Sequence, residues 1–158
     1  MSLPLVFPRH MLPSLRSCAL RQDWFLSHEH ENRMILMTNA AYSDDDVNKR
    51  VPLVIQVTDV WDVYVFPSTT WDQIAALPTG AAIYYVLDRD SGILYVGASK
   101  HLRQRWVNHH RRADLAAVGA TRIAWQAVWP EFLPLEALFI RYCEPQWQQP
   151  PSVRSSTH

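Results

Sequence analysis

Two short apolar runs on either side of a polar turn constrain the fold of this chain more than any other feature. Residues 81–87 read AAIYYVL and residues 93–97 read ILYVG, while DRDSG at 88–92 separates them. Both runs are rich in β-branched and aromatic side chains, and Asp, Ser and Gly are typical turn residues. The pattern predicts an antiparallel β-hairpin, with Gly92 available for a positive φ in the turn.

The rest of the C-terminal half alternates between helical and extended patterns. Residues 100–115 predict one helix with Leu102 and Trp106 on its inner face, and residues 121–129 predict a third strand. A last helix is expected to begin near Pro134 and to end before Pro145, with an apolar face made of Leu135, Leu138, Phe139 and Tyr142. These elements predict an α+β fold, in which helices flank a small, mainly antiparallel sheet of three strands.

Residues 1–79 are expected to form an N-terminal α/β extension of this core. Three prolines favour an extended start, and the next segment predicts a helix face made of Leu15, Leu20, Trp24 and Phe25. Residues 52–66 predict two strands or one bent strand, and residues 68–77 predict a short helix that stops before Pro78. The tract SDDD at 43–46 is typical of a solvated turn or a helix start.

The balance of charge limits the classes of function. The chain has 158 residues, with 15 basic and 15 acidic side chains and a formal net charge of zero. This excludes a protein held to nucleic acid by bulk charge alone. Neither a membrane-length apolar stretch nor a Cys-x-x-Cys pair is present, and Cys18 and Cys143 are expected to be reduced thiols. We expect a soluble cytoplasmic protein with no membrane partner.

A local concentration of basic side chains nevertheless follows the hairpin. Five cations lie between residues 100 and 112 with no acid among them, namely Lys100, Arg103, Arg105, Arg111 and Arg112. On one helix they make either a phosphate-binding patch or an ordinary solvated face. Arg105 and His109 are one helical turn apart, so the two side chains could converge on one phosphate.

Glu136 is a single carboxylate in the first turn of an otherwise apolar helix. A carboxylate at this place complements the helix dipole, which is the simpler interpretation. The alternative is a carboxylate at the edge of a cleft that holds a divalent cation, because Mg²⁺ is often bound by only one or two protein carboxylates.

The stretch AIYYVLDRDSGILYVGASKHLRQRW resembles the GIY-YIG nucleases. The first tripeptide of the family corresponds to Ala82-Ile83-Tyr84 and the second to Tyr95-Val96-Gly97, and Arg105 and Glu136 follow in the expected order. The resemblance covers about residues 80–150, and we expect residues 151–158 to be a flexible tail. Ala82 replaces the first glycine of the family, and Gln148 stands where an asparagine is common.

The resemblance implies hydrolysis of phosphodiester bonds in DNA, with Mg²⁺ or Mn²⁺ as cofactor and double-stranded DNA as partner. It implies that Glu136 holds the metal and that Arg105 neutralises the phosphate. Tyr84, hydrogen-bonded to His109, would take a proton from the attacking water, and Tyr95 would orient the water or the phosphate. Gln148 keeps the amide of the family asparagine but sets it one methylene further out, so activity could be reduced.

Lys100, Arg103, Arg111 and Arg112 are the expected DNA contacts. The resemblance implies an endonuclease of homing, restriction, phage or mobile-element type, or one that acts on branched or damaged DNA, and we expect a bacterial or phage-like, nucleoid-associated setting. The first alternative is a nucleic-acid-binding module that kept the fold while Gln148 weakened catalysis. The second is an interaction protein that uses its 7 Trp on a partner surface.

Two questions stay open in the N-terminal part. Residues 1–79 could support the catalytic sheet, confer DNA specificity or form a homodimer, and we favour support or dimerisation. His28 and His30 share a face only on a strand, and no third ligand with fitting spacing follows, so a metal site there is not expected.

Overall fold

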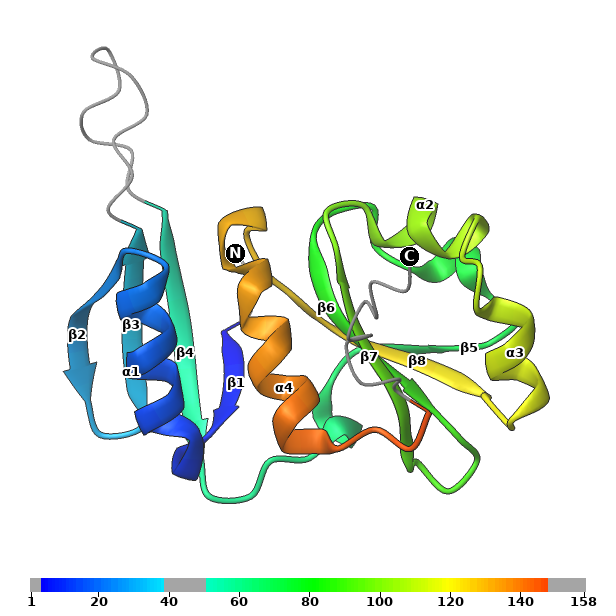
Figure 1. Cartoon of the computed structure of the whole chain (residues 1–158), viewed down its shortest axis with the longest axis horizontal. Helices are drawn as coiled ribbons and strands as arrows, with labels where there is room; N and C mark the ends of the chain where they lie inside the picture. The colour runs from blue at the N-terminus through cyan, green and yellow to red at the C-terminus, as the bar shows by residue number, and fades with distance from the viewer. Residues whose placement is uncertain (1–3, 39–50, 148–158) are drawn as a thin grey trace, which may run out of the picture.

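The computed structural model describes residues 4–38 and 51–147. Two four-stranded sheets lie side by side, and one helix, drawn in orange, lies between them (Figure 1). The acidic tract at 43–46, Gln148 and the tail at 151–158 lie outside the described residues. Within the described part of the chain, no helix is both long and apolar enough to cross a membrane.

The N-terminal sheet has the strand order β1-β4-β3-β2. Its strands are β1 (Leu5–Pro8), β2 (Trp24–His30), β3 (Arg33–Thr38) and β4 (Pro52–Thr58). β1 pairs with β4 in parallel, whereas the β2–β3 and β3–β4 pairs are antiparallel. Helix α1 (Leu12–Arg21) packs beside this sheet, so the extension contains both helix and strands as predicted (Figure 1).

Of the four residues predicted for a helix face in this region, only Leu15 is confirmed. Leu15 is buried on α1, but the Leu20 side chain is 82% exposed. Trp24 and Phe25 lie on β2 instead, because the helix ends at Arg21 and Asp23 turns the chain with a φ of 59°. Residues 52–66 likewise form neither two strands nor one bent strand over their whole length, since the single strand β4 ends at Thr58 and a 3-10 helix, η2 (Val63–Val65), follows with Asp62 as its cap.

The C-terminal sheet has the strand order β5-β8-β6-β7. Its strands are β5 (Ser68–Thr70), β6 (Ala82–Leu87), β7 (Ile93–Ser99) and β8 (Arg122–Ala127), and all pairs are antiparallel. The predicted hairpin and third strand are therefore confirmed, but the sheet has four strands and not three.

The extra strand comes from a segment predicted to be helical. The helix over residues 68–77 is wrong, because β5 pairs with β8 and only a 3-10 helix, η3 (Ile74–Ala76), follows it. Thr69 and Thr70 are β-branched residues, and the open edge of β8 offers them backbone partners that a local helix signal does not include.

β6 is the central strand of the two antiparallel pairs, and all six of its residues are buried. Ile83 and Tyr85 belong to the larger core, which they share with the N-terminal sheet and with α4 (Glu136–Cys143). Tyr84 and Val86 point to the other face and pack with the two short helices that cover it. Strands buried on both faces lose the alternating pattern of a half-exposed sheet, which accounts for the run AIYYVL.

The single helix predicted over residues 100–115 is wrong. Two helices are present, α2 (Leu102–Val107) and α3 (Arg112–Ala117), with a turn between them. The chain leaves the helix at Asn108, and His109 turns inward and stacks on the Trp106 ring at 4.2 Å between centroids. The five cations therefore do not share one helix, and Arg105 and His109 are not on one helical face.

The last helix and the hairpin turn differ from prediction in detail. Pro134 lies in a 3-10 helix, η4 (Pro130–Leu135). α4 begins at Glu136 and ends at Cys143, and the cap residue Glu144 has a φ of 44°, just before Pro145. In the hairpin turn, Ser91 and not Gly92 has the positive φ, at 59°. A Cβ on residue 92 would lie 2.7 Å from Oδ2 of Asp88, so the Asp88 carboxylate would have to shift to admit a side chain there.

A buried amide joins the two sheets at β1. The side chain of Gln126 on β8 accepts a hydrogen bond from the Val6 backbone N–H at 2.7 Å and donates one to the Val6 carbonyl at 3.3 Å. Its Nε2 also donates to the Tyr85 hydroxyl at 3.1 Å, and the Trp61 Nε1–H donates to the same Val6 carbonyl at 3.1 Å. β1 is thus paired with β4 and is also bonded to the side chains of Gln126 and Trp61.

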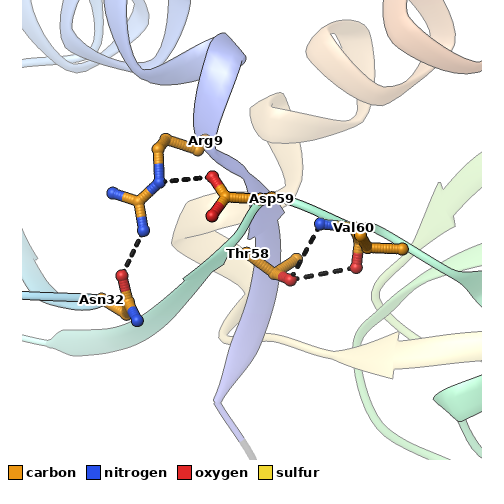
Figure 2. A network of polar contacts seen from close by, with 5 residues as sticks. All are labelled: Arg9, Asn32, Thr58, Asp59 and Val60. Carbon is orange, nitrogen blue, oxygen red and sulfur yellow. Dashed lines mark hydrogen bonds and ion pairs between the residues drawn. The ribbon is translucent and has the colours of Figure 1, made fainter.

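A second polar network lies where the chain leaves β1 (Figure 2). Arg9 donates to Asp59 from Nε at 2.7 Å and to the Asn32 side chain from its terminal nitrogen. Thr58 and Val60 exchange hydrogen bonds through the Thr58 hydroxyl. These contacts fasten the β2–β3 turn and the end of β4 to the chain that leads into α1.

Candidate active site

Tyr84 and Tyr95 lie on adjacent strands, β6 and β7, with their rings stacked 6.2 Å apart. Tyr84 is only 1% exposed, whereas Tyr95 is half-buried. Tyr84 is paired across the hairpin with Gly97, and a Cβ at position 97 would come within 2.3 Å of both Cζ and the hydroxyl oxygen of Tyr84. The glycine of the second tripeptide therefore provides the space in which the Tyr84 phenol lies.

His109 reaches the Tyr84 hydroxyl from the turn that follows α2. Its Nε2 lies 3.4 Å from the hydroxyl oxygen, and its Nδ1 accepts a hydrogen bond from the Arg111 backbone N–H at 3.1 Å. A neutral imidazole that accepts at Nδ1 carries its hydrogen on Nε2. His109 therefore donates to Tyr84, and the hydrogen of the Tyr84 hydroxyl is directed to another group.

The surroundings of His109 keep it neutral. Burial, followed by the positive charge of Arg105 and the neighbouring His110 and Arg111, lowers the pKa of His109 to about 4. The ring is 5% exposed and lies parallel to Trp106. At neutral pH it acts as a hydrogen-bond donor to Tyr84 and carries no charge of its own.

Burial also raises the pKa of Tyr84, and the neighbouring Tyr95 and Glu136 add to this rise. Arg105 opposes it, because the guanidinium on α2 lies beside the Tyr84 hydroxyl and favours its ionised form. In the protein alone the Tyr84 phenol is protonated at neutral pH. Any positive charge brought next to it acts in the same direction as Arg105.

Glu136 is the first residue of α4 and is half-buried. Burial raises the pKa of its carboxyl group to about 7, and the nearby Arg105 opposes this rise. The carboxylate is close enough to Tyr84 to affect the pKa of the phenol. The structure thus brings together five of the six side chains that the sequence marked as catalytic candidates, namely Tyr84, Tyr95, Arg105, His109 and Glu136; Gln148 is outside the described residues.

The four predicted DNA contacts have different surroundings. Lys100 is exposed, and Arg112 is partly exposed at the start of α3. Arg103 is exposed, but its Nε donates to the Leu77 carbonyl at 2.8 Å. Arg111 lies over two aromatic rings, 5.8 Å from the Tyr95 centroid and 5.4 Å from that of Trp147.

Three residues of this site were not singled out from the sequence. Gly97 gives room to Tyr84, Trp106 supports the His109 ring, and Trp147 holds Arg111 next to Tyr95. The place of Gly97 in the second tripeptide could have indicated its role. No sequence signal indicated Trp147, because its contact with Arg111 depends on the return of the chain to β7. The backbone N–H of Trp147 donates to the Leu94 carbonyl at 2.9 Å.

A cluster of three or more potential metal ligands is absent from the described ranges, 4–38 and 51–147. His28 and His30 both lie on β2. That they form no metal site stays a prediction. Cys18 and Cys143 are both free thiols.

Residues 81–150 match the family model described as the GIY-YIG catalytic domain. The match begins one residue before β6 and includes all five of the clustered side chains. The comparison with curated proteins found no match for the chain.

Proposed function

Because residues 81–150 belong to the GIY-YIG nuclease superfamily, we propose that the protein is a divalent-metal-dependent endonuclease that hydrolyses phosphodiester bonds of double-stranded DNA. The observation that carries the proposal is the convergence of Tyr84, Arg105 and Glu136 from three separate elements. Attack of water on phosphorus needs a proton acceptor, positive charge at the phosphate oxygens and a place for a cation, and these residues offer all three.

The carboxylate of Glu136 fits a hard divalent cation. It is a half-buried oxygen ligand whose pKa is raised by burial, and the nearby Arg105 offsets this rise only in part. A single protein carboxylate is enough for Mg²⁺, which keeps waters and substrate phosphates as its other ligands. We propose Mg²⁺ or Mn²⁺, and the bound ion would lower the pKa of nearby water and of the Tyr84 phenol.

Tyr84 is the proposed proton acceptor. With an ordinary pKa of about 10, roughly one phenol in a thousand is ionised at pH 7. The hydrogen bond from the His109 Nε2–H and the charge of Arg105 both favour the phenolate oxygen. Since His109 already donates to that oxygen, the hydroxyl hydrogen of Tyr84 points elsewhere, and it must leave to solvent before the phenolate can take the proton of the attacking water.

Arg105 is the proposed phosphate ligand, because its planar guanidinium can contact two phosphate oxygens at once. Tyr95 would orient the water or the phosphate beside Tyr84. Lys100, Arg103, Arg111 and Arg112 would neutralise phosphates further along the DNA. Since each chain has one such site and cuts one strand at a time, a double-strand break requires two chains, as in a homodimer, or two binding events.

The test is nicking of supercoiled plasmid in Mg²⁺ or Mn²⁺. Wild-type protein should convert the plasmid to open circles, EDTA should stop the reaction, and Glu136→Gln should lose at least about 100-fold in rate. Glu144→Gln is the matched control, because Glu144 is an exposed carboxylate at the other end of α4. Its rate should equal that of the wild type.

Two other outcomes identify the alternatives. Salt-sensitive DNA binding without nicking in either metal would contradict the enzyme and favour a nucleic-acid-binding module, in which the Gln148 substitution has weakened catalysis. Neither binding nor nicking would favour an interaction protein. If the plasmid is nicked, the next step is to find the target sequence expected of a homing, restriction, phage or mobile-element enzyme.

A further inference from the structure

A hollow of about 280 Å³ lies along one side of α2, next to the candidate active site. It is lined by Ser99, His101, Gln104, Arg105 and Asn108. Ser99 is the last residue of β7, and the other four follow the spacing of one helix face from the residue before α2 to the residue after it.

The lining consists of side chains that can donate hydrogen bonds, and it contains no carboxylate. They are a hydroxyl, an imidazole, two primary amides and a guanidinium. The Ser99 hydroxyl oxygen accepts a hydrogen bond from the His101 backbone N–H at 3.1 Å, so its own hydrogen remains available for another acceptor. A group with several anionic oxygens matches this set of donors.

Arg105 belongs both to the hollow and to the cluster around Tyr84. A ligand group in the hollow therefore lies next to the place where the scissile phosphate would meet Arg105. A polynucleotide presents a phosphate at every nucleotide, so the group adjacent to the scissile one is a second phosphate.

We propose that this hollow is a binding subsite for the backbone phosphate next to the one that is cut. Gln104 and Asn108 supply its neutral donors, with Ser99 and His101 at one end. The proposal rests on the function given above, and it adds that the substrate must carry at least two neighbouring phosphates. The hollow would set the register of the strand relative to Arg105 and Tyr84.

The first experiment measures binding without cleavage. A short fluorescent DNA duplex is titrated in EDTA, and anisotropy gives the affinity of the wild type and of Gln104→Ala and Asn108→Ala. Both side chains are neutral, so their removal leaves the net charge unchanged; each should weaken binding by about tenfold. Gln22→Ala, which removes an exposed amide beside α1, is the matched control. Wild-type affinity in both variants would overturn the proposal.

The second experiment counts phosphates. The thymidine dinucleotide TpT is compared with pTpT and TpTp as competitors of the labelled duplex. One of the extra terminal phosphates should improve competition by about tenfold for the wild type but much less for Asn108→Ala. The same gain in the wild type and in the variant would mean that the phosphate binds elsewhere. Circular dichroism of each variant checks that it is folded.

The two levels of the proposal fail separately. If the plasmid is nicked but the extra phosphate gains nothing that depends on Asn108, the subsite is wrong and the nuclease assignment stands. If the plasmid is not nicked but the gain depends on Asn108, the subsite stands as part of a nucleic-acid-binding module.

Discussion

The phenol ring of Tyr84 lies directly against the backbone of Gly97, with no room for a side chain between them. A Cβ on residue 97 would come within 2.3 Å of Cζ, which is far inside van der Waals contact. The two residues are partners across the β6–β7 hairpin. The position of the candidate proton acceptor is therefore determined by the absence of a side chain on the neighbouring strand.

Gly97→Ala should displace the Tyr84 ring. Because the ring is buried and cannot move without disturbing Trp106 and His109, we expect a loss of about 1–3 kcal/mol in the free energy of unfolding. Plasmid nicking should fall much more than DNA binding. Gly80→Ala is the control, since a Cβ at residue 80 would meet no atom within 4 Å. Wild-type nicking by Gly97→Ala would contradict the close packing.

Tyr84→Phe should remove cleavage while leaving DNA binding largely intact. The substitution keeps the ring but deletes the group that accepts the proton, and such losses reduce rates by about 10²–10⁴-fold. Tyr85→Phe is the control on the same strand, because the Tyr85 hydroxyl bonds to Gln126 on the opposite face. Nicking rates and anisotropy titrations measure the two effects. Near wild-type cleavage by Tyr84→Phe would rule out Tyr84 as the base.

The nicking rate at low Mg²⁺ should rise with pH through about 7. Burial raises the pKa of Glu136 to about 7, and only the ionised carboxylate binds a cation well. Because the metal ion favours the ionised form, a higher Mg²⁺ concentration should move the midpoint to lower pH. Initial rates measured over a grid of pH and Mg²⁺ concentrations test this. A midpoint that ignores Mg²⁺ would assign the titration to another group.

The stability of the metal-free protein should respond to pH through two groups with opposite signs. The pKa of Glu136 rises from 4.5 to about 7, so the stability it contributes is present below about 4.5 and is lost as the pH rises to about 7. The pKa of His109 falls from 6.5 to about 4, so its contribution is present above about 6.5 and is lost as the pH falls to about 4.

Glu136→Gln separates these two contributions. The variant should become steadily more stable as the pH rises from about 4 to 6.5, because only the His109 contribution remains. In the wild type the two slopes oppose each other between about 4.5 and 6.5. Urea unfolding in EDTA across this range measures both proteins. Identical pH slopes would show that Glu136 is not desolvated in the folded state.

Gln126→Leu should destabilise the junction between the two sheets. The substitution leaves the Val6 N–H without its partner and removes the hydrogen bond to Tyr85, at a cost of about 1–3 kcal/mol. Gln56→Leu, on the exposed side of β4, is the control with the same change in side chain. Urea unfolding gives the free energies. Equal stability of the two variants would mean that the buried amide contributes little.

The hairpin, the third strand and the last helix could be predicted because their signals are local. Apolar runs, turn residues and helical spacing are properties of a few consecutive residues, and each of these elements is found close to its expected place. The convergence of Arg105 and Glu136 on Tyr84 was expected from the resemblance to a family, because nothing local brings α2 and α4 to one place.

The pairing of Tyr84 with Gly97 could not be predicted by counting residues outward from the hairpin turn. Leu87 pairs with Ile93 beside the turn, and regular counting from that pair would set Tyr84 opposite Val96. An irregularity between Val86 and Leu87 shifts the register by one residue. In a strand a shift of one residue reverses which face each side chain occupies relative to its partner, so the site depends on a feature that composition does not reveal.

Tertiary contacts explain why the two helical predictions, over residues 68–77 and 100–115, were wrong. The segment at 68–77 has capping residues and apolar spacing, but the edge of β8 binds Ser68–Thr70 as a strand. The segment at 100–115 has helical spacing throughout, but the contact of His109 with Tyr84 and Trp106 requires the chain to turn after Val107. The pairing of β5 with β8 joins residues far apart in the chain. The contacts of His109 depend on a turn that a regular helix would not contain.

The strand β5 has a practical consequence for the design of any chimera that contains the matched domain. The family match starts at residue 81, yet β8 receives its outer neighbour from Ser68–Thr70, and the Pro78 and Gly80 carbonyls accept hydrogen bonds from the first residues of α2. A fragment that began at residue 81 would lack the strand that pairs with the edge of β8. It would also lack the carbonyl groups that hold the start of α2, the helix that carries Arg105. A fragment that keeps these contacts has to begin before Ser68.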